Sequence, residues 1–412
     1  MIFWLLLSAH SCFAFDKSPV TVGQIMEKEV KINASFQKDK EADWTFMWFI
    51  NGKNDLEQYA MIDINELESS GSDSKVNIVA EMGRINGQDG DDNSDGNWVG
   101  VKRYFIVKDA DRNKINSPVL ADLGKKDMGS WKELADFIVW SKKNYPAKKY
   151  ALIMWDHGNG WKPVDENNWQ NFYKGFSLDE ETGNEISVPQ MAKALSKAGG
   201  VDFILLDGCN MAMASVIYEL KDYAKVAAAS QETEPGMVVR YSSVLAEVKK
   251  GELSPEDLGF YFVYYYRAYF EQMSGDNEGA AATQSAFRLY KASEFSSVLD
   301  RWVSVALKSD ISVLSKAKKE AKFFGEDPDY KDLSDFVSLV YKQTQSQELK
   351  KVSIELDNFL KKDFIIYNWA QDSKSAGLSV YIPSEKYREE YSGLKFSKNG
   401  LWDEFARFMA DK

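Results

Sequence analysis

Histidine and cysteine are scarce in this sequence. Its 412 residues contain two of each, and His10 and Cys12 lie within the first 14 residues. Removal of that segment would leave one imidazole, His157, and one thiol, Cys209. A single cysteine excludes an internal disulfide, and one histidine with one cysteine leaves two ligands of a zinc site to be found among carboxylates. Imidazole or thiol chemistry in the mature chain therefore falls on His157 and Cys209.

Basic character and long apolar runs are also missing. The formal net charge is −12, which argues against a nucleic-acid partner but would attract cationic peptides. After residue 14 no run reaches the roughly 18 apolar residues that a membrane helix needs. We therefore expect no nucleic-acid partner, no membrane span and a monomer.

The first 14 residues have the pattern of a secretory signal. Residues 2–7 are apolar, and Cys12, Phe13 and Ala14 stand where small residues precede a cleavage site. The segment lacks the usual basic residues, and lipidation at Cys12 is a competing interpretation that lacks an aliphatic residue among residues 9–11. We expect a signal peptide over residues 1–14 and an exported protein, either secreted or periplasmic.

The two residues of interest follow similar apolar runs. Residues 150–155 precede His157, residues 201–206 precede Cys209, and a glycine lies beside each site residue. Such runs are typical of buried parallel strands, and ligands gather at the carboxyl ends of these strands in open α/β sheets. The pattern predicts that His157 and Cys209 share one rim.

Strand and helix patterns alternate through the first part of the chain. This order predicts an α/β fold, with a mostly parallel sheet covered on both faces, over residues 15–240. Residues 241–412 are expected to be mostly helical and to contribute strands to the sheet. The predicted strands are residues 44–50, 76–82, 101–107, 150–155, 201–206, 226–229, 283–289 and 377–382. The predicted helices include residues 55–70, one capped by Ser130, one from Ser187 to Ser196, and residues 210–220, 258–273, 294–307 and 333–342.

Cys209 and His157 have the chemistry of a nucleophile and its partner. A helix beginning at about Asn210 would favour the thiolate, and the imidazole could stabilise that anion and protonate a leaving amine. The backbone N–H groups of Gly158 and Cys209 could form an oxyanion hole. Alternatively, both residues are buried and structural, because free cysteine is among the most buried residue types.

Asp207 lies two residues before Cys209 on an extended segment, so both side chains face the same way. A lone anion there opposes thiolate formation, unless an Arg or Lys of a substrate offsets the charge. Alternatively, Asp207 caps the following helix. Glu232 and Glu234 could add negative potential, although solvated loop charges are the preferred interpretation of these two residues.

Residues 89–96 contain the first half of a calcium-loop pattern. Asp91, Asn93 and Asp95 have the spacing of ligands, and Gly96 follows, but Lys102 stands where the bidentate Glu should be. Turn chemistry explains the same residues equally well. Calcium is therefore compatible with this loop but is not required by it.

The two strand-end segments resemble those of a known family, the clostripain-like C11 cysteine peptidases of clan CD. Residues 155–161, Trp-Asp-His-Gly-Asn-Gly-Trp, are similar to the family's histidine motif. Residues 206–212, Leu-Asp-Gly-Cys-Asn-Met-Ala, are similar to its Asp-x-Cys motif, with Gly208 where Ala is more usual. Residues 44–56, 230–236 and 377–383 support the resemblance, which covers nearly the whole mature chain.

The resemblance implies a three-layer caspase-like fold and cleavage of peptide bonds after Arg or Lys. It implies that Cys209 is the nucleophile, His157 its partner and Asp207 the acid that binds the basic side chain. Family members often cleave themselves between the two motifs. Lys174 is our candidate for the residue before the cleaved bond, and Lys162 is the other lysine at this place. No cofactor is implied, although some members respond to calcium.

Two other functions share these residues. An amidase or acyl transferase would use the same Cys-His pair without needing a cationic side chain in its substrate. A non-catalytic binding protein with the caspase fold would use neither residue. A comparison of activity on Arg peptide amides and on neutral peptide amides distinguishes the protease from the amidase or transferase. The effect of Cys209→Ala distinguishes the protease from the binding protein.

Overall fold

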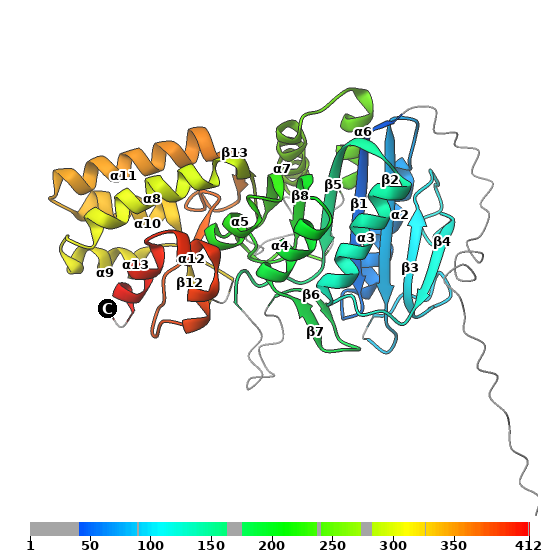
Figure 1. Cartoon of the computed structure of the whole chain (residues 1–412), viewed down its shortest axis with the longest axis horizontal. Coiled ribbons are helices and arrows are strands. Elements are labelled where there is room, and N and C mark those ends of the chain that lie inside the picture. The colour runs from blue at the N-terminus through cyan, green and yellow to red at the C-terminus, as the bar shows by residue number, and fades with distance from the viewer. Residues whose placement is uncertain are drawn as a thin grey trace, which may run out of the picture. The chain divides into compact units, whose positions relative to one another are not determined.

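A nine-stranded sheet forms the centre of the described chain (Figure 1). The computed structural model describes residues 41–88, 90–162, 175–236, 240–272, 282–325, 327–410 and 412. In these residues the strand order is β13-β10-β9-β8-β5-β1-β2-β3-β4. In chain order the strands are β1 (Ala42–Gly52), β2 (Val76–Arg84), β3 (Gly100–Phe105), β4 (Val119–Gly124), β5 (Ala147–Trp155), β8 (Val201–Asp207), β9 (Ala224–Ala229), β10 (Thr283–Arg288) and β13 (Ile365–Ala370).

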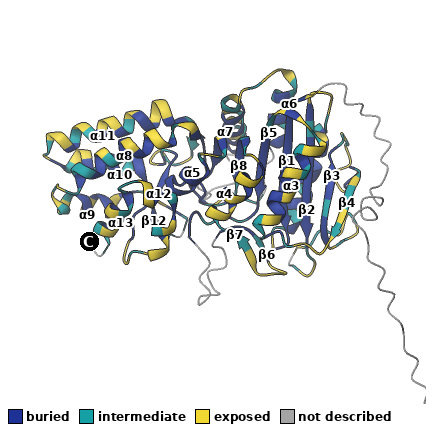
Figure 2. Ribbon diagram, viewed as in Figure 1, coloured by how far each residue is buried: buried dark blue, intermediate teal, exposed yellow. Residues whose placement is uncertain are grey.

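The five central strands, β9, β8, β5, β1 and β2, are parallel to one another. At one edge β10 and β13 pair antiparallel, and at the other edge β3 and β4 do the same. The predicted mostly parallel sheet is therefore confirmed. The central strands are apolar on both faces because helices cover both, as Figure 2 shows by their burial.

Helices form a layer on each face of the sheet. Along β1, Phe46 and Trp48 join one apolar cluster, while Met47 and Phe49 join another. The first cluster includes α2 (Glu57–Ser70), α6 (Tyr241–Lys250) and α7 (Pro255–Gln272). The second includes α3 (Trp131–Asn144), α4 (Val188–Lys197) and α5 (Ala214–Leu220). The alternation of side chains along a strand thus produces the three-layer sandwich.

Further helices extend the second cluster beyond the β13 edge (Figure 1). They are α8 (Ala292–Ala306), α9 (Ile311–Glu320), α10 (Leu333–Gln343), α11 (Gln347–Phe359), α12 (Lys395–Asn399) and α13 (Trp402–Met409). Short 3₁₀ or π turns occupy Leu289–Lys291, Leu360–Phe364 and Glu389–Gly393. A small sheet joins β11 (Phe323–Phe324), β12 (Asp327–Asp332) and β14 (Ser379–Tyr381), and a hairpin joins β6 (Phe176–Asp179) and β7 (Asn184–Ile186). None of the described helices is both long and apolar enough to cross a bilayer.

The predicted serine caps are confirmed, but the predicted helix start at Asn210 is wrong. Ser130 accepts the N–H of Lys132, and Ser187 forms a capping box with Gln190. After β8, however, Asn210 has a φ of 61°, and α5 begins four residues later. Residues 210–212 pair instead with the loop after β9: the N–H of Asn210 donates to Glu232 O at 3.2 Å, and its side-chain amide donates to Gln231 O at 2.8 Å.

Candidate active site

His157 and Cys209 lie just beyond the carboxyl ends of two adjacent strands. Trp155 at the end of β5 pairs with Asp207 at the end of β8, so His157 and Cys209 each follow a paired position by two residues. Both line one cavity of about 870 Å³. The structure therefore brings the imidazole and the thiol to the shared rim that the sequence predicts.

Two glycines allow the loops that carry these residues to touch. A Cβ atom at Gly158 would lie 2.7 Å from the carbonyl oxygen of Cys209, and one at Gly208 would lie 2.5 Å from that of Asp156. Real Cβ atoms do not approach backbone this closely, so the contact requires glycine at both positions unless the loops move apart. The spacing of the two motifs is therefore fixed by backbone contact.

The Cys209 thiol is buried, and this environment disfavours its ionised form. Burial raises its pKa to about 11, although the backbone N–H groups of Glu234, Cys209 itself and Gly158 oppose this shift. The N–H of Glu234 donates to the sulfur at 3.3 Å. Because α5 begins only at Ala214, the predicted stabilisation of the thiolate by a helix N-terminus is absent here.

Asp55 is a site residue that the sequence did not reveal. Its carboxylate lies 2.7 Å from Nε2 of His157, and the two side chains are 51% and 16% exposed. Asp55 follows β1, which lies beside β5 in the sheet. Its signal in the sequence is its position just after an apolar strand, as for the other two residues, but that signal becomes useful only once β1 and β5 are known to be neighbours.

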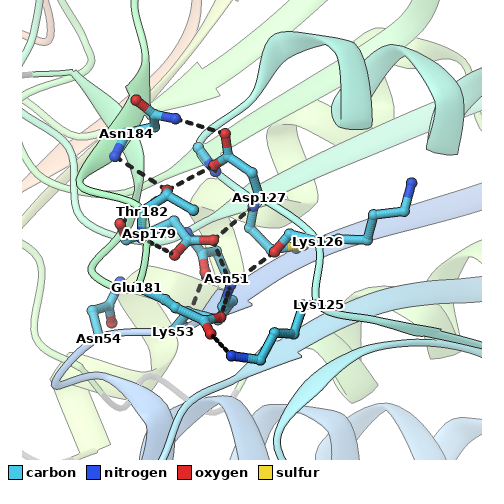
Figure 3. Close-up of polar contacts among 12 residues, drawn as sticks. Asn51, Lys53, Asn54, Lys125, Lys126, Asp127, Asp179, Glu181, Thr182 and Asn184 are labelled. Carbon is cyan, nitrogen blue, oxygen red and sulfur yellow. Dashed lines mark hydrogen bonds and ion pairs between the residues drawn. The ribbon is translucent and has the colours of Figure 1, made fainter. Parts of the chain in front are cut away.

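The turn that carries Asp55 is held by a polar network, and Figure 3 shows the part of it around Lys53, Asp179 and Glu181. Asn54 donates to Asp156 Oδ1 at 2.7 Å and to the carbonyl of Leu178 at 2.9 Å. Lys53 is 1% exposed and lies 2.7 Å from Asp179 and 2.9 Å from Glu181. The β1–α2 turn is thereby tied to both the histidine loop and the β6–β7 hairpin.

Asp207 is ion-paired inside the chain. Its Oδ1 lies 2.6 Å from Nη2 of Arg240, and its Oδ2 accepts the hydroxyl of Tyr241. Burial is the largest influence on Asp207 and opposes its ionisation, but the charge of Arg240 and hydrogen bonds from Glu234, Tyr241 and Arg240 together outweigh it and lower the pKa of the carboxyl below its ordinary value. These partners precede and begin α6, so the alternative in which Asp207 caps the helix after Cys209 is not what the structure shows.

The two acids after β9 are not solvated loop charges, contrary to the preferred interpretation of the sequence. Glu232 is buried, and its Oε1 accepts the N–H of Gly325 at 2.6 Å. Glu234 lines the cavity and accepts from Gln284 at 3.0 Å. Burial, followed by the neighbouring charge of Asp207, raises the pKa of Glu234 well above its ordinary value.

The C-terminal half supplies the other wall of the cavity. Residues 325 and 327–329 and residues 384–388 line it. Lys162 is 7% exposed on its side chain and pairs with Asp327, with Asp329 also within 3.4 Å. Lys174 and the predicted signal, residues 1–14, lie outside the described residues.

Hydrogen bonds within the calcium-like loop account for the side chains of Asp91 and Asp95. Asp91 accepts the N–H groups of Gly87 and Gln88, and Asp95 accepts the indole N–H of Trp98. Within the described ranges, which omit Asp89, no group of three or more His, Cys, Asp or Glu residues is arranged to hold a metal ion. The described part of the loop thus shows turn chemistry.

The fold is similar to that of solved bacterial proteases. A secreted C11 cysteine protease from Bacteroides thetaiotaomicron, solved with an irreversible peptide inhibitor, matches with a TM-score of 0.65 and 20% identity, covering 88% of this chain and 100% of that chain. An inactive zymogen C11 protease from Parabacteroides distasonis matches with a TM-score of 0.64 and 20% identity, covering 87% and 98%. These similarities confirm the caspase-like class of fold.

The sequence comparison identifies the family. Residues 48–408 match the clostripain family, peptidase family C11, and the chain belongs to this family. Clostripain from Hathewaya histolytica is 25% identical over 240 residues, which is 54% of this chain and 46% of clostripain. The match therefore spans about half the length of that relative.

Proposed function

We propose that this protein is a cysteine endopeptidase in which Cys209 is the nucleophile and His157 its acid-base partner. The observation that carries the proposal is the position of both residues at adjacent strand ends, lining one cavity. Membership of the clostripain family supports it. Asp55, 2.7 Å from the imidazole, acts through His157 as a positioning residue.

The proposed reaction proceeds by acyl transfer to sulfur and then to water. His157 removes the thiol proton as Cys209 attacks the substrate carbonyl, and the same proton then passes to the leaving amine when the C–N bond breaks. Water, deprotonated by His157, hydrolyses the thioester and regenerates the thiol. The N–H groups of Gly158 and Cys209, which both oppose the raised pKa of the thiol, would stabilise the oxyanion. This route uses no cofactor, and calcium would act only as a structural or regulatory ion.

We further propose that the scissile bond follows Arg or Lys. Two carboxyl side chains, those of Asp207 and Glu234, line the cavity beside Cys209. The resemblance of residues 206–212 to the family's Asp-x-Cys motif supports the same preference. An amidase or acyl transferase acting on neutral groups would have no use for acids at this position.

Export and self-processing complete the proposal. The apolar start of the sequence is consistent with a signal peptide, and one solved protein of similar fold is described as secreted. Another is described as an inactive zymogen, and we propose activation of this chain by cleavage after Lys174. Mature active protein should then run as two fragments on a denaturing gel, and a single intact chain would contradict self-processing.

The decisive experiment is covalent labelling with a peptide-Arg electrophile. We expect modification of Cys209 by mass spectrometry, loss of labelling in Cys209→Ala and strong loss in His157→Ala. Equal labelling by matched Arg and neutral peptides would favour the amidase or transferase alternative. Hydrolysis that persists in Cys209→Ala would overturn the assignment of the nucleophile.

A further inference from the structure

The negative charge of Asp207 is already matched by a buried cation of the same chain. Both carboxylate oxygens are occupied, one by Arg240 and the other by Tyr241. Arg240 is 2% exposed, and its guanidinium carbon lies 4.9 Å from the ring centroid of Tyr266. A cationic side chain that enters the cavity therefore meets an ion pair at Asp207 and not an uncompensated carboxylate.

Glu234 is the second acid at this place, and it has the contacts that a substrate-sensing group needs. It lines the cavity, its backbone N–H donates to the Cys209 sulfur, and its side chain is hydrogen-bonded to Asp207 and Gln284. Burial and the charge of Asp207 keep the pKa of Glu234 well above its ordinary value. A hydrogen bond between two carboxyl groups needs a proton on one of them, and the opposite directions of the two pKa shifts assign that proton to Glu234 when no substrate is bound.

We propose that Glu234 is the specificity-determining acid of this site, and that it gives up its proton to solvent when an Arg or Lys side chain of a substrate binds. This inference rests on the proposed function. The N–H groups of the incoming cation replace the lost proton as hydrogen-bond donors between the two carboxylates. The site thus gains a negative charge only when a positive charge arrives.

The surrounding charges favour this exchange. Arg240 and Tyr241 at the start of α6 face Asp207, and Tyr266 on α7 lies over Arg240. Behind Arg240, Asp63 and Glu66 on α2 are buried, and burial is the largest cause of the raised pKa of each. With Asp207 and Arg240 paired and Glu234 protonated, this part of the site is close to neutral. A cation that enters without ionisation of Glu234 would leave a net positive charge in a desolvated place, which is unfavourable.

The test compares a peptide amide carrying Arg with one carrying citrulline, its neutral isostere. The ratio of their kcat/KM values cancels the titration of Cys209 and His157, which both substrates share. Because binding of the cation releases a proton, the ratio should rise with pH until Glu234 is ionised in the free protein, and then level off. In Glu234→Gln, which mimics the protonated carboxyl and keeps its hydrogen bonds, the ratio should not change with pH and should be about tenfold lower at high pH.

Glu385→Gln is the matched control, because Glu385 is an exposed acid that also lines the cavity. This variant should keep the pH dependence of the wild type. A ratio that does not change with pH in the wild type, or a Glu234→Gln variant that follows the wild-type curve, would overturn the role of Glu234. Hydrolysis of the citrulline peptide that is lost in Cys209→Ala would show in either case that the proposed role of Cys209 as nucleophile still stands. A ratio near one at every pH would overturn both the preference for basic residues and this inference.

Discussion

The imidazole and the thiol depend on different neighbours for their chemistry. His157 has a carboxylate partner in Asp55. The largest influence on the pKa of Cys209 is burial, which disfavours the thiolate. In the mechanism that we propose, the raised pKa of the thiol means that the reaction begins with proton removal when substrate is present. The residue types identified His157 and Cys209 in the sequence, but nothing in the sequence connects Asp55 with a residue 102 positions later, or Asp207 with Arg240.

Alkylation of Cys209 should reveal its raised pKa. The rate of reaction with iodoacetamide should increase about tenfold per pH unit between about pH 7 and pH 9, because the thiolate fraction grows in that proportion far below the pKa. A small peptide thiol should approach its plateau in the upper part of this range and serves as the control. A plateau below about pH 8 in the protein would show that the thiol is activated before substrate binds.

Removing the Asp55 carboxylate should slow catalysis without weakening substrate binding. In Asp55→Ala we expect kcat to fall about tenfold while KM is retained, because a half-exposed charge-assisted hydrogen bond is lost. Asp55→Glu should restore part of the rate. A variant that changes KM and leaves kcat intact would argue against a role through the imidazole.

At the scale of elements, the connections between strands and helices determine which residues meet. Serine caps at residues 130 and 187 were predictable because one side chain and its own helix suffice. The helix start after Cys209 was not, since the N–H groups of Asn210 and Ala212 bond to carbonyls from the loop after β9. Contacts with a distant loop override local helical preference there.

The β1–α2 turn should lose much of its stability without Lys53. Lys53→Met leaves the fully buried Asp179 without its cation, and we expect a loss of about 3–5 kcal/mol in the free energy of unfolding, measured in urea. Lys125→Met is the matched control, because Lys125 also pairs with Glu181 but is 88% exposed on its side chain. Similar stability of both variants would show that the buried pair does not support the turn.

At the scale of the whole molecule, the two halves of the chain share their apolar clusters. Phe203 on β8 stacks on Phe262 of α7 at 5.1 Å, and one cluster runs from Met47 to Met409. The alternation of apolar runs predicted the parallel centre of the sheet. It could not predict β13 as a neighbour of β10, because antiparallel pairing of strands far apart in sequence leaves no local pattern.

A fragment that ends at residue 240 should not fold by itself. Residues 41–240 lack β10 and β13 at the sheet edge and α6 and α7 on one face, so buried side chains such as Phe203 would be exposed to water. We expect residues 41–412 to show a cooperative thermal transition by circular dichroism and the fragment to show none. A cooperative transition in the fragment would establish residues 41–240 as an independent domain.

The backbone contact between Gly158 and Cys209, and that between Gly208 and Asp156, set the distance between the loops that carry His157 and Cys209. A methyl group at position 208 would push the two loops apart, because its carbon would lie 2.5 Å from the carbonyl oxygen of Asp156. A cysteine motif transplanted from a homologue with Ala at position 208 would therefore hold the two loops at the wrong distance from each other. Such a graft should work only if the tips of β5 and β8 are exchanged together.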